Sequence, residues 1–143
     1  MMNPVHHYRF FLLPLAWTLI ILVLSLLPPS AAPGSFLFNI PYGDKLLHFL
    51  FYLFLAVFWL LAFAGKVNKS NSLFRFAILL ACIVFGGIIE IIQGFTAFRS
   101  MDAFDWLADA AGSSLALLCF DRVRKMKVQL VNKIKCLSAV FPS

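Results

Sequence analysis

Charged residues are scarce in this sequence, and acidic residues are scarcer than basic ones. Only 13% of the 143 residues are charged, and 6 of them are aspartate or glutamate, whereas about a quarter of a typical soluble chain is charged. Hydrophobic residues make up 62% of the chain, and the mean hydropathy is +0.93. A soluble domain of this length could not bury so much apolar side chain, whereas lipid accepts it. The composition therefore predicts an all-α integral membrane protein.

Cysteine is also scarce, and common catalytic motifs are missing. The 3 cysteines are an odd number, and two of them lie in or beside apolar runs, which predicts free thiols and no disulfide framework. The sequence contains no HExxH, GxSxG or P-loop motif and no paired-cysteine motif. No cofactor is evident, although a divalent cation remains open. The net charge of +6 comes from bases at the ends of apolar runs, so nucleic-acid binding is not expected.

Four apolar runs predict a four-transmembrane-helix bundle, with helices at about 10–27, 45–64, 73–95 and 102–120. The first run is longer than the apolar core of a signal peptide, and Pro33 would directly follow the candidate cleavage site, so we expect this helix to be retained. Residues 28–43 should form an apolar loop that lies at the interface or folds over another part of the chain. We divide the chain into a membrane domain, 1–120, and a basic, amphipathic cytoplasmic tail helix, 121–143, that lies on the membrane. A solvated tail is the alternative.

The basic residues predict the orientation of the bundle. One side of the membrane receives Arg9, three bases at 66–75 and six bases in the tail, which is 10 of the 12 in the chain. The other side receives only Lys45 and Arg99. Because short cytoplasmic segments are enriched in lysine and arginine, we expect both termini to be cytoplasmic.

Four of the 6 acidic residues fall in one stretch, Glu90–Gly112, between two apolar runs. A charge in the centre of a membrane helix costs about 2.5–3.5 kcal/mol even on insertion scales. A rise of about 1.5 Å per residue places His48, Glu90 and Asp105 in the outer third of the bilayer, although they belong to three different helices. We therefore expect ionisable groups from three helices to meet near the extracytoplasmic side.

Spacings of three and four residues place these groups on single helix faces that point into the bundle. A stripe of small residues, Ala108, Gly112 and Ala116, would let a neighbouring helix approach closely. Simpler explanations remain open for several of the polar residues, as helix caps for Asp44 and Asp102 and as a first-turn acid for Asp105. Lys45 and Arg99 are either counter-ions for the acids or ligand-binding groups.

Two segments of this sequence resemble the VanZ-like family of small membrane proteins. The matching elements are DKLLHFLFYLFLAVF, from Asp44, and the run Glu90-x-x-Gln93, Arg99, Asp102, Asp105, Gly112. The resemblance implies a four-helix membrane protein of the bacterial cytoplasmic membrane. The namesake is associated with resistance to the glycopeptide teicoplanin. Asp109 stands where the family usually has asparagine, so a bound cation or a protonated carboxyl would have to offset the extra charge.

Two hypotheses follow. In the first, a polar pocket on the outer side binds an envelope ligand, such as the headgroup of a lipid-linked cell-wall precursor or a glycopeptide, and membrane lipid is a further partner. In the second, the protein is a membrane enzyme in which Glu90, His48 and Asp109 act in acid/base catalysis or hold a divalent metal ion, with magnesium, calcium or manganese favoured over zinc. The predicted ligand-binding residues are Asp44, Lys45, His48, Tyr52, Glu90, Gln93, Arg99, Asp102, Asp105 and Asp109.

Overall fold

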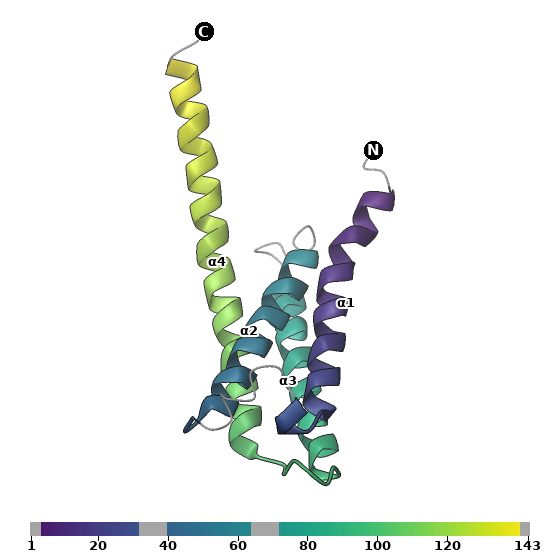
Figure 1. The fold of residues 1–143 in the computed structure, drawn as a ribbon. Coiled ribbons are helices and arrows are strands. Elements are labelled where there is room, and N and C mark those ends of the chain that lie inside the picture. The colour runs from purple at the N-terminus through teal and green to yellow at the C-terminus, as the bar shows by residue number, and fades with distance from the viewer. Residues whose placement is uncertain (1–3, 32–39, 64–71, 141–143) are drawn as a thin grey trace.

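The computed structural model describes the backbone of residues 4–31, 40–63 and 72–140, and these residues form helices and no strand. Side chains are described for residues 11–28, 30–31, 40–63, 72–120 and 122. The elements in chain order are α1 (Pro4–Leu26), the short 3-10 helix η1 (Pro29–Ala31), α2 (Gly43–Ala62), α3 (Ser72–Gly94) and α4 (Ala103–Val140). Figure 1 shows the four α-helices as a bundle, with α4 projecting well beyond the others.

The number of helices agrees with the sequence prediction, and the boundaries differ in two places. Helices α2 and α3 begin and end within two residues of the predicted positions. Helix α1 begins earlier than predicted and continues through Pro14. Helix α4 passes the predicted boundary at 120 and runs without a break for 38 residues. No proline occurs in that stretch, so nothing in the chain forces the helix to end where the apolar run ends.

Three of the helices are long and apolar enough to cross a membrane. These are α2, α3 and the first part of α4, Ala103–Phe120, with mean hydropathies of 2.0, 2.4 and 1.2. The described part of α1 adds a shorter apolar helix, Phe11–Leu26. Large apolar side chains on all four helices are exposed, among them Leu12, Phe54, Leu73 and Leu118. A surface of this kind suits lipid rather than water, and the chain is a membrane protein.

Helix α2 lies at the centre of the packing and contacts each of the other three helices. The indole Nε1 of Trp17 on α1 donates a hydrogen bond to the Phe51 carbonyl oxygen at 3.0 Å. On the opposite side, α2 and α4 approach closely at Gly112, where an added Cβ would collide with the Phe49 carbonyl oxygen. The predicted small-residue stripe on α4 therefore contacts a neighbouring helix. The core between the helices contains Ile21, Tyr52, Leu55, Ala56, Leu60, Ile78, Cys82 and Ala116.

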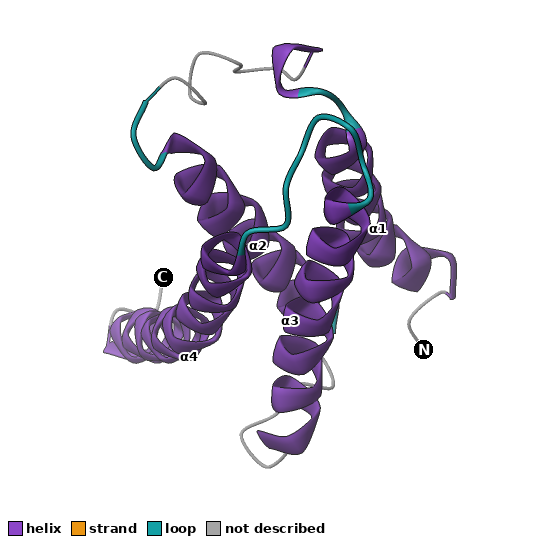
Figure 2. Ribbon diagram, turned by 90° about the horizontal axis from the view of Figure 1, so that it is seen from below, coloured by secondary structure: helices purple, strands orange, loops and turns teal. Residues whose placement is uncertain are grey.

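The two ends of the bundle are different. The start of α1 and the end of α4 lie at the upper end in Figure 1, and the end of α1, the start of α2 and the connection from α3 to α4 lie at the lower end. Figure 2 shows the α3–α4 connection crossing this lower end. The predicted covering role of the apolar loop falls largely on residues 32–39, which lie outside the described residues. Of the described loop residues, Ile40 and Tyr42 are 50% and 77% exposed.

Candidate functional site

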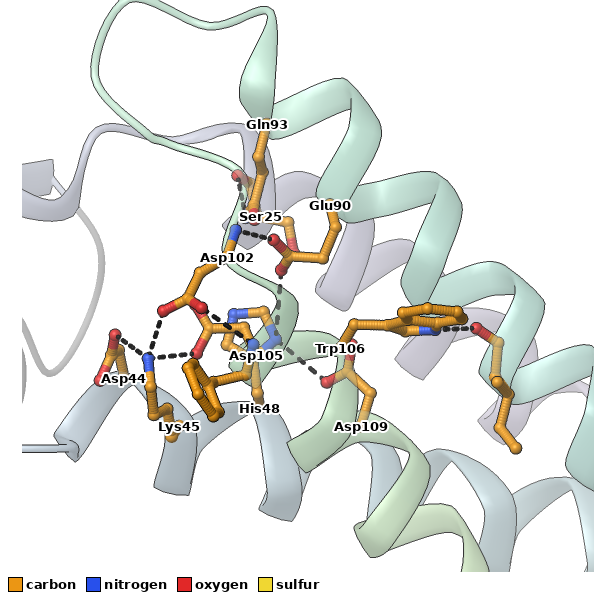
Figure 3. Close-up of polar contacts among 12 residues, drawn as sticks. Ser25, Asp44, Lys45, His48, Glu90, Gln93, Asp102, Asp105, Trp106 and Asp109 are labelled. Carbon is orange, nitrogen blue, oxygen red and sulfur yellow. Dashed lines mark hydrogen bonds and ion pairs between the residues drawn. The ribbon is translucent and has the colours of Figure 1, made fainter.

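A lysine and three carboxylates form an ion-pair group at the lower end of the bundle. The Lys45 ammonium Nζ lies 3.2 Å from Asp44 Oδ2, 2.6 Å from Asp102 Oδ2 and 3.0 Å from Asp105 Oδ1. An ammonium group has three N–H donors, and here each has an acceptor (Figure 3). Lys45 therefore neutralises charge at the start of α4 while it joins α4 to the start of α2. This arrangement favours the counter-ion interpretation of Lys45.

A second, more deeply buried group lies beside it and draws one residue from each of α2, α3 and α4. His48 Nδ1 lies 3.0 Å from Asp109 Oδ1 and 3.9 Å from Glu90 Oε1. The exposed fractions are 8% for His48, 3% for Glu90 and 0% for Asp109. We call these three residues the buried triad. Together with the Lys45 group they form one continuous polar cluster in Figure 3.

Backbone hydrogen bonds from the start of α4 connect the two groups. The Asp102 N–H donates to Glu90 Oε2 at 3.0 Å, and the Phe104 N–H donates to Asp102 Oδ1 at 2.8 Å. Asp102 therefore caps α4, which was one of the two explanations that the sequence left open. The capping explanation does not hold for Asp44, because α2 begins one residue earlier, at Gly43, and its cap position is Tyr42 with a left-handed φ of 61° and no side-chain hydrogen bond. Asp44 instead contacts Lys45.

Two carboxylate oxygens in the buried triad accept no hydrogen bond from the described part of the chain. They are Glu90 Oε1 and Asp109 Oδ2. The hydroxyl groups of Tyr52 and Ser113, one helical turn further along α2 and α4, are also buried without a partner. An unsatisfied buried polar atom costs about 1–3 kcal/mol, and more when it is charged. The triad therefore has unused capacity to bind a proton or a cation.

A glycine on α3 makes room for the Asp109 side chain. A Cβ added at Gly86 would lie 2.6 Å from Asp109 Oδ2 and 3.2 Å from Asp109 Cβ. Any other residue at position 86 would push the carboxylate or separate α3 from α4. Beside this contact, the Trp106 indole Nε1 donates to the Ile83 carbonyl oxygen at 2.9 Å. The glycine and the tryptophan together fix how α4 lies against α3.

Two polar groups of the cluster lie outside the spanning helices, and their pKa values shift downward for different reasons. The hydrogen bond from Lys45 lowers the pKa of the Asp102 carboxyl, and the bond from the Phe104 N–H adds to this effect. Burial lowers the pKa of the Arg99 guanidinium, while the negative charges of Asp105, Glu90 and Asp44 oppose that shift. Arg99 therefore experiences the same acidic environment as Lys45.

Most of the predicted site residues meet, and two serve mainly other contacts. Gln93 turns toward α1, where its Nε2 donates to the Ser25 carbonyl oxygen at 3.0 Å. Tyr52 is part of the hydrophobic core. The remaining predicted residues belong to the polar cluster or interact with it electrostatically: Asp44, Lys45, His48, Glu90, Arg99, Asp102, Asp105 and Asp109.

Sequence reasoning missed Ser113 and Trp106. Ser113 follows Asp109 by four residues, so helical spacing alone could have found it. The role of Trp106 depends on which faces of α3 and α4 meet, and no pattern within one helix gives that information. The sequence predicts Gly86 as a small residue that allows a close helix contact, and the structure places Asp109 of α4 against it.

Two sets of side chains in the cluster bring potential metal ligands close together. In each set, one ligand atom per residue lies within 4.8 Å of the others; the first set is His48, Glu90 and Asp109, and the second is Asp44, Asp102 and Asp105. The second set already surrounds the Lys45 ammonium. Within the described part of the chain, only the first set has buried oxygens without a hydrogen-bond partner, one on Glu90 and one on Asp109.

Comparison with known proteins gives one distant relative. No family model matches the chain, and no solved structure matches it. The chain is 32% identical over 94 residues to the uncharacterized protein C11E3.10 of Schizosaccharomyces pombe. The match covers 65% of this chain and 56% of the yeast protein, so the chain spans little more than half of that relative's length. These comparisons assign no family, and the resemblance to VanZ-like proteins stays a prediction.

Proposed function

We propose that this protein binds the headgroup of a membrane-embedded envelope lipid at the polar cluster. The observation that supports this most strongly is the burial of His48, Glu90 and Asp109, from three helices, at one end of an otherwise apolar bundle. Ionisable residues within spanning helices are expensive, and they mark ligand or ion sites more often than structural ones. The cluster lies at the end of the helices, where a lipid headgroup would be.

The charge of the cluster restricts the ligand. Five carboxyl groups, at positions 44, 90, 102, 105 and 109, face two permanent cations, Lys45 and Arg99. With His48 neutral and all five carboxyls ionised, the cluster has an excess of three negative charges, which protonation or a bound cation would reduce. Lys45 is already bonded to three carboxylates. The cluster therefore favours a cationic group, or a phosphate bridged by a metal cation, over a bare anion.

The biological setting belongs to the same proposal. The resemblance to VanZ-like proteins favours the cytoplasmic membrane of a bacterium and a lipid-linked cell-wall precursor or a glycopeptide as the ligand, in an envelope or resistance role. The relative in a fission yeast gives no support to a ligand confined to bacteria. A lipid phosphate headgroup is the chemistry that both kinds of membrane share, and we prefer it for that reason.

Ligand-dependent stability of the detergent-purified protein tests this function. A lipid-linked pyrophosphate sugar, a phospholipid series and teicoplanin should each be titrated while the melting temperature of the wild type and of Glu90→Gln is recorded. We expect a saturable increase for a phosphate-bearing lipid, which Glu90→Gln reduces. Equal shifts for every lipid, or equal shifts in both proteins, would contradict specific binding at the cluster.

An enzyme that acts on such a lipid is the second candidate, and the contact between His48 and Asp109 favours it. A carboxylate 3.0 Å from a buried imidazole nitrogen orients the ring and strengthens it as a base. On this hypothesis Glu90→Gln abolishes turnover of the bound lipid and leaves its affinity intact. Mass spectrometry of a phosphate-bearing lipid incubated with the protein would detect the product, and an unchanged lipid would count against catalysis.

A further inference from the structure

The buried triad combines one imidazole and two carboxylates at distances that one metal ion can span. Two ligand atoms that are each about 2.1 Å from the same ion lie at most about 4.2 Å apart. His48 Nδ1 is 3.0 Å from Asp109 Oδ1 and 3.9 Å from Glu90 Oε1, and both distances are within this limit. All three residues offer ligand atoms within 4.8 Å of one another, so a small movement of Glu90 or Asp109 would complete the site. The three ligand atoms come from α2, α3 and α4, so an ion between them would be held by three helices at once.

The hydrogen bonding of the triad also favours a bound metal ion. Glu90 uses Oε2 to accept the Asp102 N–H, whereas its Oε1 faces His48 and accepts no hydrogen bond from the described residues. Asp109 uses Oδ1 toward His48, whereas its Oδ2, at 0% exposure, accepts none from the same part of the chain. Buried charges in proteins are paired or coordinate a metal. The triad therefore offers a divalent cation one histidine nitrogen and two buried carboxylates, each with a spare oxygen.

In the neighbouring ion-pair group, the carboxylates already have a cation between them. There, a lysine ammonium already occupies the space between Asp44, Asp102 and Asp105. That group needs no added cation. It also provides a matched control, because its carboxylates lie close to the triad and have the same charge.

We propose that His48 Nδ1, Glu90 Oε1 and the Asp109 carboxylate bind one divalent metal ion, and that this ion is manganese or zinc. Imidazole favours zinc, and carboxylates favour manganese, magnesium and calcium, so the mixed set excludes the two ions that prefer oxygen alone. This choice differs from the sequence-based preference for magnesium, calcium or manganese. Asp102 and Asp105 contact Lys45 instead, so the imidazole of His48 is one of only three ligands in the proposed set. The ion replaces the proton between His48 and Asp109. The inference rests on the proposed function, in which the ion would bridge the protein and a lipid phosphate.

Metal binding should first be measured without lipid. The chelator-treated, full-length protein in detergent would be titrated with MnCl2, ZnCl2, MgCl2 and CaCl2, and the bound metal counted by mass spectrometry after gel filtration. We expect one manganese or zinc ion per chain and an affinity at least tenfold weaker for magnesium and calcium. Asp109→Asn and Glu90→Gln should each lower the affinity at least tenfold. Asp102→Asn keeps the backbone N–H that bonds to Glu90 and removes only a nearby charge, so it should lower the affinity less than threefold. Equal affinity in wild type and Asp109→Asn would overturn the proposal.

A spectroscopic measurement keeps the proposal testable if these variants fold poorly. The chain has 3 histidines, at positions 6, 7 and 48, so replacing His6 and His7 by glutamine leaves His48 as the only imidazole. In this otherwise wild-type protein with 15N-labelled histidine, bound Mn2+ should show coupling to one nitrogen by pulsed electron paramagnetic resonance. Bound manganese without nitrogen coupling would exclude His48 as a ligand.

The two proposals can fail separately. If metal binds and no lipid raises the melting temperature in its presence, the headgroup function is wrong and the metal site stands. If a lipid raises the melting temperature equally with chelator and with manganese, the headgroup function stands and the bridging role of the metal is wrong.

Discussion

Among single residues, Asp102 has two roles, as a helix cap and in an ion pair, and one substitution can remove the second without the first. Its Oδ1 caps α4 through the Phe104 N–H, and its Oδ2 contacts Lys45. Asparagine is an equally good helix cap but carries no charge. Asp102→Asn should therefore retain the cap and lose only the ion pair. The Asp102 side chain is 35% exposed, so we expect a loss of about 0.2–1 kcal/mol in the free energy of unfolding, as for exposed pairs.

The pH dependence of this effect has a definite sign. Lys45 lowers the pKa of Asp102 in the folded protein below its ordinary value of 3.8, so the unfolded chain binds the proton more readily. The stabilisation from Asp102 is then fully present above pH 4 and is lost as pH falls through the folded-state pKa. Melting temperatures of wild type and Asp102→Asn between pH 2.5 and 6 should converge at the acidic end. A gap that widens below pH 4 would contradict the assignment.

Substitution of Gly86 tests the steric packing of α3 against α4 rather than the charge of the cluster. Gly86→Ala places a methyl group against Asp109, 3.2 Å from its Cβ, and overpacking of this kind costs about 1–3 kcal/mol. The neighbouring Gly87→Ala is a matched control, since its added Cβ meets only the indole of Trp106, at 3.3 Å. Trp106 is 44% exposed and can shift toward the surface, so Gly87→Ala should cost no more than a weakened hydrogen bond to the Ile83 carbonyl oxygen. We expect Gly86→Ala to lower the melting temperature clearly more than Gly87→Ala, and the reverse order would be evidence against the α3–α4 packing.

Between elements, the approach of α2 to α4 depends on Gly112. Gly112→Ala would collide with the Phe49 carbonyl oxygen and come within 3.1 Å of the Leu53 nitrogen. Backbone cannot rotate away as a side chain can, so the two helices must separate. Because Lys45 and His48 contact α4 from α2, the separation would also disturb the polar cluster. We expect the free energy of unfolding to fall by about 1–3 kcal/mol or more, which thermal unfolding would measure.

Ala111→Leu provides the control for this substitution. It adds more volume one residue earlier, at an exposed position of the same helix, and should be tolerated in detergent. A protein that accepts Gly112→Ala as readily as Ala111→Leu would show that α2 and α4 do not approach as described.

The helices could be predicted well from sequence, and the contacts between them could not. Apolar runs located α2 and α3 to within two residues, because a spanning helix must be apolar over its length. Helical rise also indicated that His48, Glu90 and Asp105 would lie at one level, and helical spacing placed Asp109 on the same face as Asp105. The pairing of Lys45 with acids 57 and 60 residues away depends on the rotation of α4 against α2. Periodicity within one helix does not determine that rotation.

For the whole molecule, the orientation in the membrane is the prediction with the largest consequence. The distribution of bases predicts cytoplasmic termini, which would place the polar cluster on the outer side, since the termini and the cluster lie at opposite ends (Figure 1). Phe98 lies in the α3–α4 connection and is 55% exposed. In a variant whose three native cysteines are replaced by serine, Phe98→Cys should react with an impermeant maleimide in intact cells. Lys69→Cys, in the predicted cytoplasmic loop, should react only after lysis, and the opposite pattern would invert the orientation.

The contacts of Lys45 with the start of α4 also affect how the chain can be assembled during synthesis. Lys45 is synthesised 57 residues before Asp102, its partner at the start of α4. Synthesis of these residues takes about 3–11 s at common rates of translation. Throughout that interval the ammonium of Lys45 and the imidazole of His48 have no partner from α4, in a helix that must already enter the membrane. A nascent chain arrested before α4 should therefore be recognised by membrane proteases or insertion factors. Helix α4 would act as the step that commits the bundle to its final form.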